Sequence, residues 1–303
     1  MTERKETLVG LSLVPEAGSW RQLAEVTHVA DEGGLDLIGI QDHPYQWRFL
    51  DTFASIAALL ARTSRIRIFP DVANLPLRPP AMLAKTAASL DLISGGRFEL
   101  GLGAGAFWDA IEAMGGPRRT PREAVDALAE AIELIRLMWS GERSVSYPGQ
   151  YYHVRGVHPG TPPPHEIEIW VGAYGPRMLR LIGRLADGWI PSLGRVTRGD
   201  LRSAHAMIDE AAQAAGRDPS SIRRLLNIGG TITAAGRGDL HEPGRSAGRL
   251  SSGLAGPPEF WHELLSGFKE IGFSGFVFWL PEETPEQIAR LSEEVAPRIR
   301  EAP

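Results

Sequence analysis

The segment "GIQDHPYQW", residues 39 to 47, holds the side chains best suited to chemistry. An imidazole changes its protonation state near neutral pH, so either His43 supplies or accepts a proton or it only satisfies the turn before Pro44. Asp42 either shares a hydrogen-bonding arrangement with His43 or caps the loop. Trp47 either walls a substrate pocket or packs on the loop. This pattern predicts a proton-handling site centred on His43.

A second segment, "RFELGLGAGAFW" at residues 97 to 108, contains G-x-G-x-x-A from Gly101 to Ala106. In a dinucleotide-binding domain a helix opens directly behind such glycines, and an acidic residue ends the next strand about 20 residues on. Here a clear helical stripe begins only at Pro121, and the next strand lies roughly 60 residues on, so the context of a Rossmann fold is missing. The glycines are expected instead to let a ligand approach the backbone.

Short apolar runs alternate along the chain with stretches of helical period. The runs that predict strands are Leu8–Leu13, Leu37–Ile40, Ile66–Phe69, Phe98–Leu102, Ile167–Val171, Gly188–Ile190, Leu226–Thr233 and Phe276–Leu280. A helix is expected after each run, such as Trp20–Glu32 after the first. Eight such units predict parallel strands that close into a (β/α)8 TIM barrel, an α/β fold.

The chain is expected to form one domain over residues 1–303. Its insertions at the carboxyl-terminal mouth are expected at about 104–120, 141–166 and 234–256. The proline-rich second insertion is predicted to hold a small hairpin and three surface residues, His153, His158 and His165. The glycine-rich third insertion either stays a mobile linker or covers an anionic cofactor tail with its arginines, Arg237, Arg245 and Arg249.

In a barrel of this kind, functional groups follow the carboxyl ends of the strands. Few charged residues are expected there. The first strand, "LVGLSL", has no H-x-H pair, and the chain has no G-x-S-x-G elbow, so neither a metal site nor a serine hydrolase is predicted. A largely apolar mouth with one acid–imidazole pair favours a large, flat organic cofactor.

Composition excludes several other classes of protein. The 32 basic and 37 acidic residues give a net charge of −5, and neither sign forms a long run, so no nucleic-acid partner is expected. The chain has no cysteine, which excludes disulfides and cysteine nucleophiles. No apolar run approaches the roughly 20 residues that cross a bilayer, and the N-terminus lacks the apolar region of a signal peptide. We therefore expect a cytoplasmic protein with no membrane partner.

Four segments resemble the bacterial luciferase-like superfamily of flavin- and deazaflavin-dependent oxidoreductases. They are "GIQDHPYQW", "DLISGGRFELGLGAG", "GGPRRTPREAVDALAEAIELIRLMWSG" and "VGAYGPRMLRLIGRLADGWIPS". The resemblance runs from about residue 8 to residue 192 and implies a (β/α)8 barrel with long insertions at its mouth.

Within the superfamily, flavin mononucleotide (FMN) members often carry Glu-His after the second strand, and deazaflavin (coenzyme F420) members often carry Asp-His, as at Asp42-His43. Trp47 matches an active-site tryptophan of the deazaflavin sugar-phosphate dehydrogenases. Those enzymes have an acidic residue where this chain has Ala106, which argues against a sugar phosphate as substrate. The resemblance therefore implies F420 as cofactor, with FMN as the alternative.

The resemblance also suggests where the cofactor binds. The segment Asp71, Val72, Ala73 and Asn74 matches a bulge that commonly has a non-prolyl cis peptide behind the central ring, here at Asp71–Val72. The loop Gly172, Ala173, Tyr174, Gly175 and Pro176 precedes a helix and either presents amides to the cofactor's phosphate or forms a plain turn. The strand-four loop Gly103, Ala104, Gly105 and Ala106 completes the expected site.

Three functions are compatible with these features. The first is an oxidoreductase that transfers a hydride between F420 and a small organic substrate, with His43, Asp42 and Trp47 as catalytic residues. The second is an FMN-dependent monooxygenase that uses reduced flavin and oxygen. The third, which Ala106 favours, is a cofactor-binding barrel without catalysis. The resemblance further implies a homodimer, and a separate reductase would supply reduced cofactor to a monooxygenase.

Overall fold

Parallel strands form a closed ring in this computed structural model, which describes residues 6–195, 198–234 and 254–301. The nine-stranded sheet has the order β3-β2-β1-β13-β10-β9-β8-β5-β4. Its two end strands, β3 (Arg67–Pro70) and β4 (Ala73–Asn74), are consecutive pieces of chain separated only by Asp71 and Val72. β3 pairs with β2, and β4 pairs with β5. β3 and β4 therefore act together as the third strand of the barrel, and the nine strands form a closed ring of eight. The protein is a (β/α)8 barrel, as predicted.

The other barrel strands lie close to their predicted positions. They are β1 (Leu8–Leu13), β2 (Leu37–Ile40), β5 (Leu100–Gly103), β8 (Ile169–Val171), β9 (Gly188–Trp189), β10 (Arg223–Gly229) and β13 (Gly275–Trp279). The seventh strand differs from the expected Leu226–Thr233. It starts three residues earlier and ends before Gly230, where a side chain would collide with Leu254 and Trp261, and the chain then pairs as β11 (Thr231–Ile232) with β12 (Ala255–Gly256) outside the ring.

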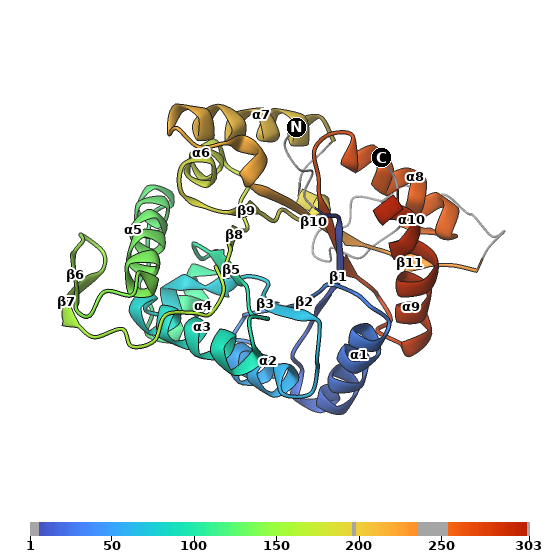
Figure 1. The fold of residues 1–303 in the computed structure, drawn as a ribbon, viewed down its shortest axis with the longest axis horizontal. Helices are drawn as coiled ribbons and strands as arrows, with labels where there is room; N and C mark the ends of the chain where they lie inside the picture. The colour runs from blue at the N-terminus through green and yellow to red at the C-terminus, as the bar shows by residue number, and fades with distance from the viewer. Residues whose placement is uncertain (1–5, 196–197, 235–253, 302–303) are drawn as a thin grey trace.

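Helices form an outer layer around the strands (Figure 1). Their bounds are α1 (Trp20–Glu32), α2 (Thr52–Leu60), α3 (Pro80–Ser94), α5 (Pro121–Trp139), α6 (Pro176–Leu185), α7 (Arg198–Ala214), α8 (Pro258–Lys269), α9 (Pro285–Arg290) and α10 (Ala296–Glu301). Helix α5 starts late because residues after β5 form the short α4 (Trp108–Ala113) first. A capping box between Thr120 and Glu123 then fixes its start. In the described ranges, no helix has the length and apolar character needed to cross a membrane.

Two apolar clusters hold the barrel together. The larger one lies between the strands and the helices, and the smaller one fills the barrel interior with the buried side chains Leu8, Leu37, Phe69, Trp170, Ile190, Leu225 and Val277. Residues on a strand alternate between these clusters, since Val9 and Leu226 face outward next to Leu8 and Leu225. The same alternation turns Ser12, four positions after Leu8 on β1, and Asn227, two positions after Leu225 on β10, into the barrel.

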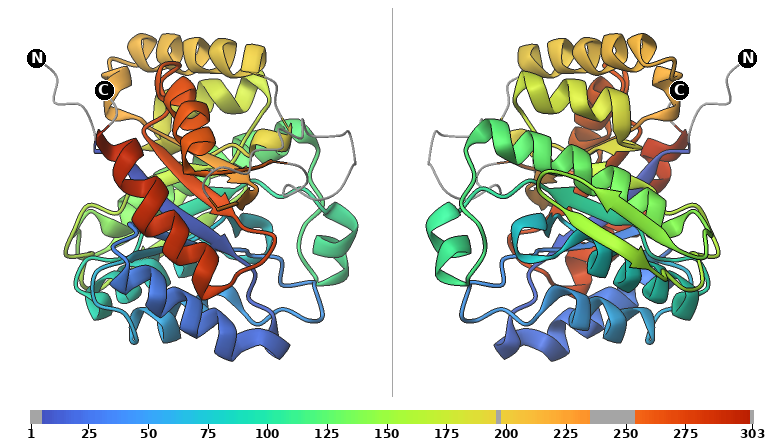
Figure 2. Two further views of the ribbon diagram at one scale, coloured as in Figure 1. Left: turned by 90° about the vertical axis from the view of Figure 1, so that its right-hand side faces the viewer. Right: turned by 90° about the vertical axis from the view of Figure 1, so that its left-hand side faces the viewer.

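The expected hairpin is present as antiparallel β6 (Val145–Pro148) and β7 (His153–Val157), which lies outside α5 (Figure 2, right). His165, predicted at the surface, is instead partly buried: it contacts Asp91 at 2.7 Å and Glu99 at 3.5 Å, and both carboxylates are buried. These two hydrogen-bonded carboxylates raise the pKa of His165 to about 9, against the opposing effect of burial. The prediction failed because both carboxylates are distant in sequence. The third insertion's Arg237, Arg245 and Arg249 lie outside the described residues.

Candidate active site at the carboxyl ends of the strands

Asp42, directly after β2, is the centre of a buried ion pair. Its carboxylate accepts hydrogen bonds from Arg78 Nε and Nη2, both at 2.7 Å, and from the Asn74 backbone N–H at 2.8 Å. Burial lowers the pKa of Arg78, but its hydrogen bonds to Asp42 and Asp51 outweigh this and raise it above the ordinary value. Asp42 therefore ties the loop that carries His43 to the loop that follows the third strand.

His43 lies beside two aromatic rings. Its Nδ1 is 2.7 Å from the hydroxyl of Tyr45, and its ring meets Phe107 edge-on with centroids 5.5 Å apart. Burial, and then the charge of Asp42, raise the pKa of Tyr45 to about 12, so this phenol keeps its proton at neutral pH. Trp47, four residues further on, is 89% exposed, and the guanidinium of Arg48 lies 5.9 Å from its ring centre.

The third strand changes direction between Asp71 and Val72, and the peptide bond between them is cis, at the position that the resemblance indicates. The Asp71 carboxyl points into the barrel, where Ser12 Oγ donates to it at 2.7 Å and Asn227 Nδ2 at 3.1 Å. Burial raises the pKa of Asp71, and these two hydrogen bonds offset the effect only in part.

The glycine loops surround Val72. A Cβ atom on Gly103 would lie 2.8 Å from a Val72 methyl group, and one on Gly172 would lie 3.3 Å away, so the space these glycines leave is used by the protein itself. Gly105 has φ +98°, a conformation that favours glycine. Beyond it, Ala106 ends the loop and brings no acidic group there.

The loop Gly172–Pro176, which follows β8, leads directly into α6, and Pro176 is the first residue of that helix. The Ser192 backbone N–H donates to the Tyr174 hydroxyl at 3.0 Å, and the Trp189 indole donates to the carbonyl of Ala173 at 2.9 Å. Gly175 precedes the helix without a side-chain cap. The loop therefore combines a helix N-terminus with side-chain contacts to the neighbouring strand β9.

Three buried side-chain atoms at this end of the barrel have no protein partner in the described part of the chain: Asn74 Oδ1, Asn227 Oδ1 and Trp279 Nε1. A buried polar group without a partner costs about 1–3 kcal/mol, so a bound molecule that satisfies it is favoured. The two asparagine oxygens can accept a hydrogen bond, and the indole nitrogen can donate one. Flavins and deazaflavins carry both N–H and carbonyl groups along one ring edge, so the donor and acceptor set fits such a ring.

Sequence reasoning missed Arg78, Tyr45 and Asn227 as site residues. Asn227 was detectable as the polar residue in the run "LLNIG", whereas nothing near Arg78 in sequence indicates its partner 36 residues away. Glu283, in the loop after β13, was also missed. Burial and the neighbouring charge of Glu16 raise the pKa of Glu283 to about 7.

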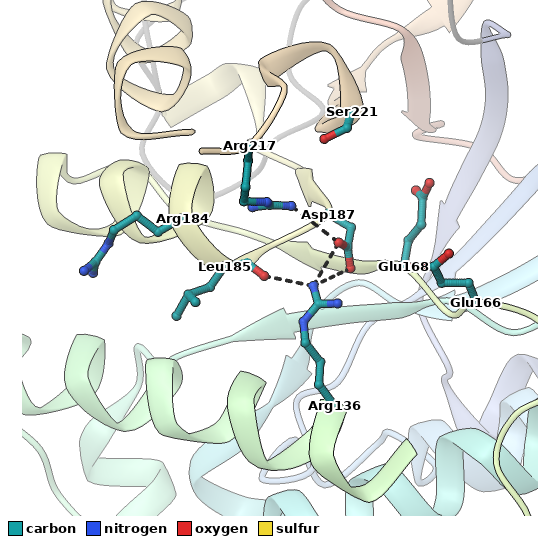
Figure 3. Close-up of a pocket in the computed structure, with 8 residues that line it drawn as sticks. All are labelled: Arg136, Glu166, Glu168, Arg184, Leu185, Asp187, Arg217 and Ser221. Carbon is teal, nitrogen blue, oxygen red and sulfur yellow. Dashed lines mark hydrogen bonds and ion pairs between the residues drawn. The ribbon is translucent and has the colours of Figure 1, made fainter. Parts of the chain in front are cut away.

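A cavity of about 560 Å³ lies at the opposite end of the barrel (Figure 3). It is lined by residues that precede strands or lie on the surrounding helices: Arg136, Glu166, Glu168, Arg184, Leu185, Asp187, Arg217 and Ser221. Arg136 and Arg217 both pair with Asp187. Because barrel enzymes place their chemistry at the carboxyl ends of the strands, the converging strand ends locate the site and this cavity does not. No group of three or more possible metal-binding side chains occurs within the described ranges.

Known proteins match both the sequence and the fold. Residues 7–237 match the model of the family described as luciferase-like monooxygenase. The F420-dependent glucose-6-phosphate dehydrogenase of Gordonia bronchialis is 31% identical over 231 residues, covering 74% of this chain and 68% of the relative.

Two solved structures illustrate the range of cofactors among proteins with this fold. An F420-dependent secondary alcohol dehydrogenase, in complex with an F420–acetone adduct, superposes with a TM-score of 0.84 at 20% identity, covering 98% of this chain and all of the other. A type II Baeyer–Villiger monooxygenase of Pseudomonas putida, in complex with FMN, superposes with a TM-score of 0.77 at 20% identity over 97% of this chain and 99% of the other. At this identity, the likeness establishes the shared fold.

Proposed function

Because the chain belongs to the luciferase-like monooxygenase family, we propose that it is an oxidoreductase that transfers a hydride between F420 and a small organic substrate. The observation that carries the proposal is the hydrogen bond from the Asn74 backbone N–H to Asp42, which joins the loop that carries His43 to the segment that follows the cis peptide Asp71–Val72. The F420-dependent relative supports the choice of cofactor. We do not extend its sugar-phosphate substrate to this chain, because Ala106 stands at the position where the resemblance implies an acidic residue in those dehydrogenases.

Bound F420 supplies a carbon that accepts or gives a hydride, and the protein must manage the accompanying proton. Tyr45 keeps its hydroxyl proton and can donate it to His43 Nδ1, which places the imidazole proton on Nε2, the atom suited to exchange with the substrate. Asp42 acts through Arg78 and Asn74 to hold the His43 loop in place. Trp47, exposed beside Arg48, would form a wall on the substrate side.

The segment Asp71–Asn74 and the two glycine loops, Gly103–Ala106 and Gly172–Pro176, would hold the cofactor. The unpartnered atoms of Asn74 and Trp279 support a polar ring edge at this place. The N-terminus of α6 is suited to an anionic group, because its backbone N–H groups and the helix dipole both favour negative charge. A cytoplasmic homodimer of one-domain subunits remains part of the proposal.

The test is an anaerobic screen in which the absorbance of oxidised F420 is followed with small alcohols and other hydride donors. Turnover by the wild type and its loss in His43→Ala would support catalysis and exclude a merely cofactor-binding barrel. If F420 binds but no hydride donor or acceptor is turned over, the result would favour a cofactor-binding barrel without catalysis.

A flavin monooxygenase is the second candidate function, favoured by the fold shared with an FMN-bound monooxygenase. Such an enzyme would receive reduced flavin from a separate reductase. Oxygen consumption with reduced FMN separates the two candidates, because deazaflavins do not react readily with oxygen.

A further inference from the structure

Asp71 belongs to a polar layer that crosses the top of the barrel interior. Asp71 lies between β3 and β4, which together form the third barrel strand, Ser12 lies on the first strand, β1, and Asn227 lies on the seventh, β10. Odd-numbered strands of a (β/α)8 barrel contribute side chains to the same interior layer, so these three groups meet although Asp71 and Asn227 are 156 residues apart. Below this layer the interior is apolar.

The two aspartates at this end of the barrel are held by opposite kinds of partner. Asp42 has a guanidinium against it, with two hydrogen bonds of 2.7 Å. Asp71 has a hydroxyl and a carboxamide, and in the described part of the chain no arginine or lysine pairs with it. Asp71 is partly buried, and an ionised carboxylate withdrawn from water with only neutral donors is costly, whereas the protonated acid is not.

Asn227 supplies a matching acceptor. Its Oδ1 atom is buried without a donor, although its Nδ2 atom contacts Asp71. A protonated carboxyl can donate to the oxygen of Ser12 or, after a rotation of the amide, to Asn227 Oδ1, so the layer accommodates the neutral acid. An ionised carboxylate can only accept, so both Ser12 and Asn227 must then donate to it.

We propose that Asp71 works as an uncharged carboxylic acid and acts as a positioning residue for the cofactor, an inference that rests on the proposed function. Its hydrogen bonds anchor one side of the Asp71–Val72 segment, and Val72 anchors the other side against Gly103 and Gly172. An uncharged anchor would also keep an unpaired negative charge away from the end of the barrel where the proposed hydride transfer takes place.

The test compares one substitution at the two aspartates. Asp71→Asn preserves size and neutral hydrogen bonding, so the unfolding midpoint should stay within about 2 °C of wild type. Asp42→Asn removes the charged partner of the partly buried Arg78 and should lower the midpoint well beyond that range. A drop in Asp71→Asn as large as that in Asp42→Asn, or failure of Asp71→Asn to fold, would overturn the uncharged state.

Cofactor binding tests the positioning role. Oxidised F420, followed by its fluorescence, should bind Asp71→Asn within about threefold of wild type and Asp71→Ala at least about tenfold more weakly. Equal binding by all three proteins would remove the positioning role. Equal weakening in both variants would show that the charge is required.

Infrared spectroscopy of the cofactor-free protein at pH 7 gives a readout independent of the proposed function. With carboxyl-labelled aspartate, the wild type should show a protonated-carboxyl band that is missing from Asp71→Asn. A carboxylate band in its place contradicts the uncharged state. If the wild type binds neither F420 nor FMN, the proposed function fails, while this measurement and the stability comparison still decide the charge of Asp71.

Discussion

Removing the charge of Arg78 should destabilise the protein strongly. In Arg78→Met, the buried Asp42 carboxylate loses both guanidinium hydrogen bonds and keeps only the backbone N–H of Asn74. The third bond of Arg78, to the half-exposed Asp51, adds little because water screens it. Breaking a buried ion pair by removing one partner costs about 3–5 kcal/mol. We expect the lower end, about 3 kcal/mol, because the Asn74 N–H still solvates the charge.

Urea unfolding, with the free energy extrapolated to water, measures this loss. The matched control is Arg21→Met, the same change at an exposed position on α1, which should stay within about 0.5 kcal/mol of wild type. The double variant Asp42→Asn with Arg78→Met should recover part of the loss, since no uncompensated charge remains. If Arg78→Met is no less stable than Arg21→Met, the buried pair does not hold these loops together.

Three further predictions concern individual titratable groups. His43→Gln should lower turnover by about 10²–10⁴ while changing the affinity for oxidised F420 much less, as steady-state rates and binding titrations would show. The pKa of His165, raised to about 9, predicts stability that is complete below about pH 6.5 and falls as pH rises through 9, by at most about 3 kcal/mol. Urea unfolding of His165→Gln should lack this fall. The pKa of Glu283, raised to about 7, predicts that stability falls between about pH 4.5 and 7 as the carboxyl ionises in its buried place. Glu283→Gln should therefore be more stable than wild type at pH 8 and equal to it at pH 4, and an equal difference at both pH values would be incompatible with this titration.

The barrel could be predicted from sequence because its signals are local. Apolar runs such as Leu8–Leu13 and Leu37–Ile40 match the strands residue for residue, and several helices, among them α2, α3 and α5, begin at a proline or after a capping side chain. The end of the seventh strand was missed because Thr231, Ile232 and Thr233, which follow Gly230, are β-branched residues that favour a strand. After Gly230 the chain leaves the ring and pairs with Ala255–Gly256, and a side chain at Gly230 would collide with Leu254 and Trp261. Neither feature is visible in a local pattern.

The site was only partly predictable, since its residues meet through closure of the ring. The position of His43 after the second strand follows from the strand pattern, and the cis peptide at Asp71–Val72 follows from the resemblance. The partners of Asp42 and Asp71 could not be predicted from the sequence. Arg78 reaches Asp42 across two loops, and Asn227 reaches Asp71 across the barrel, so both contacts depend on the three-dimensional register of the strands.

The most direct test of the proposed function is a fluorescence titration of the purified protein with oxidised F420 and, in parallel, with FMN. We predict micromolar or tighter binding of F420 and clearly weaker binding of FMN. Preference for FMN would contradict the proposal in favour of oxygen chemistry, and binding of neither cofactor would contradict the assignment of a cofactor site to this end of the barrel.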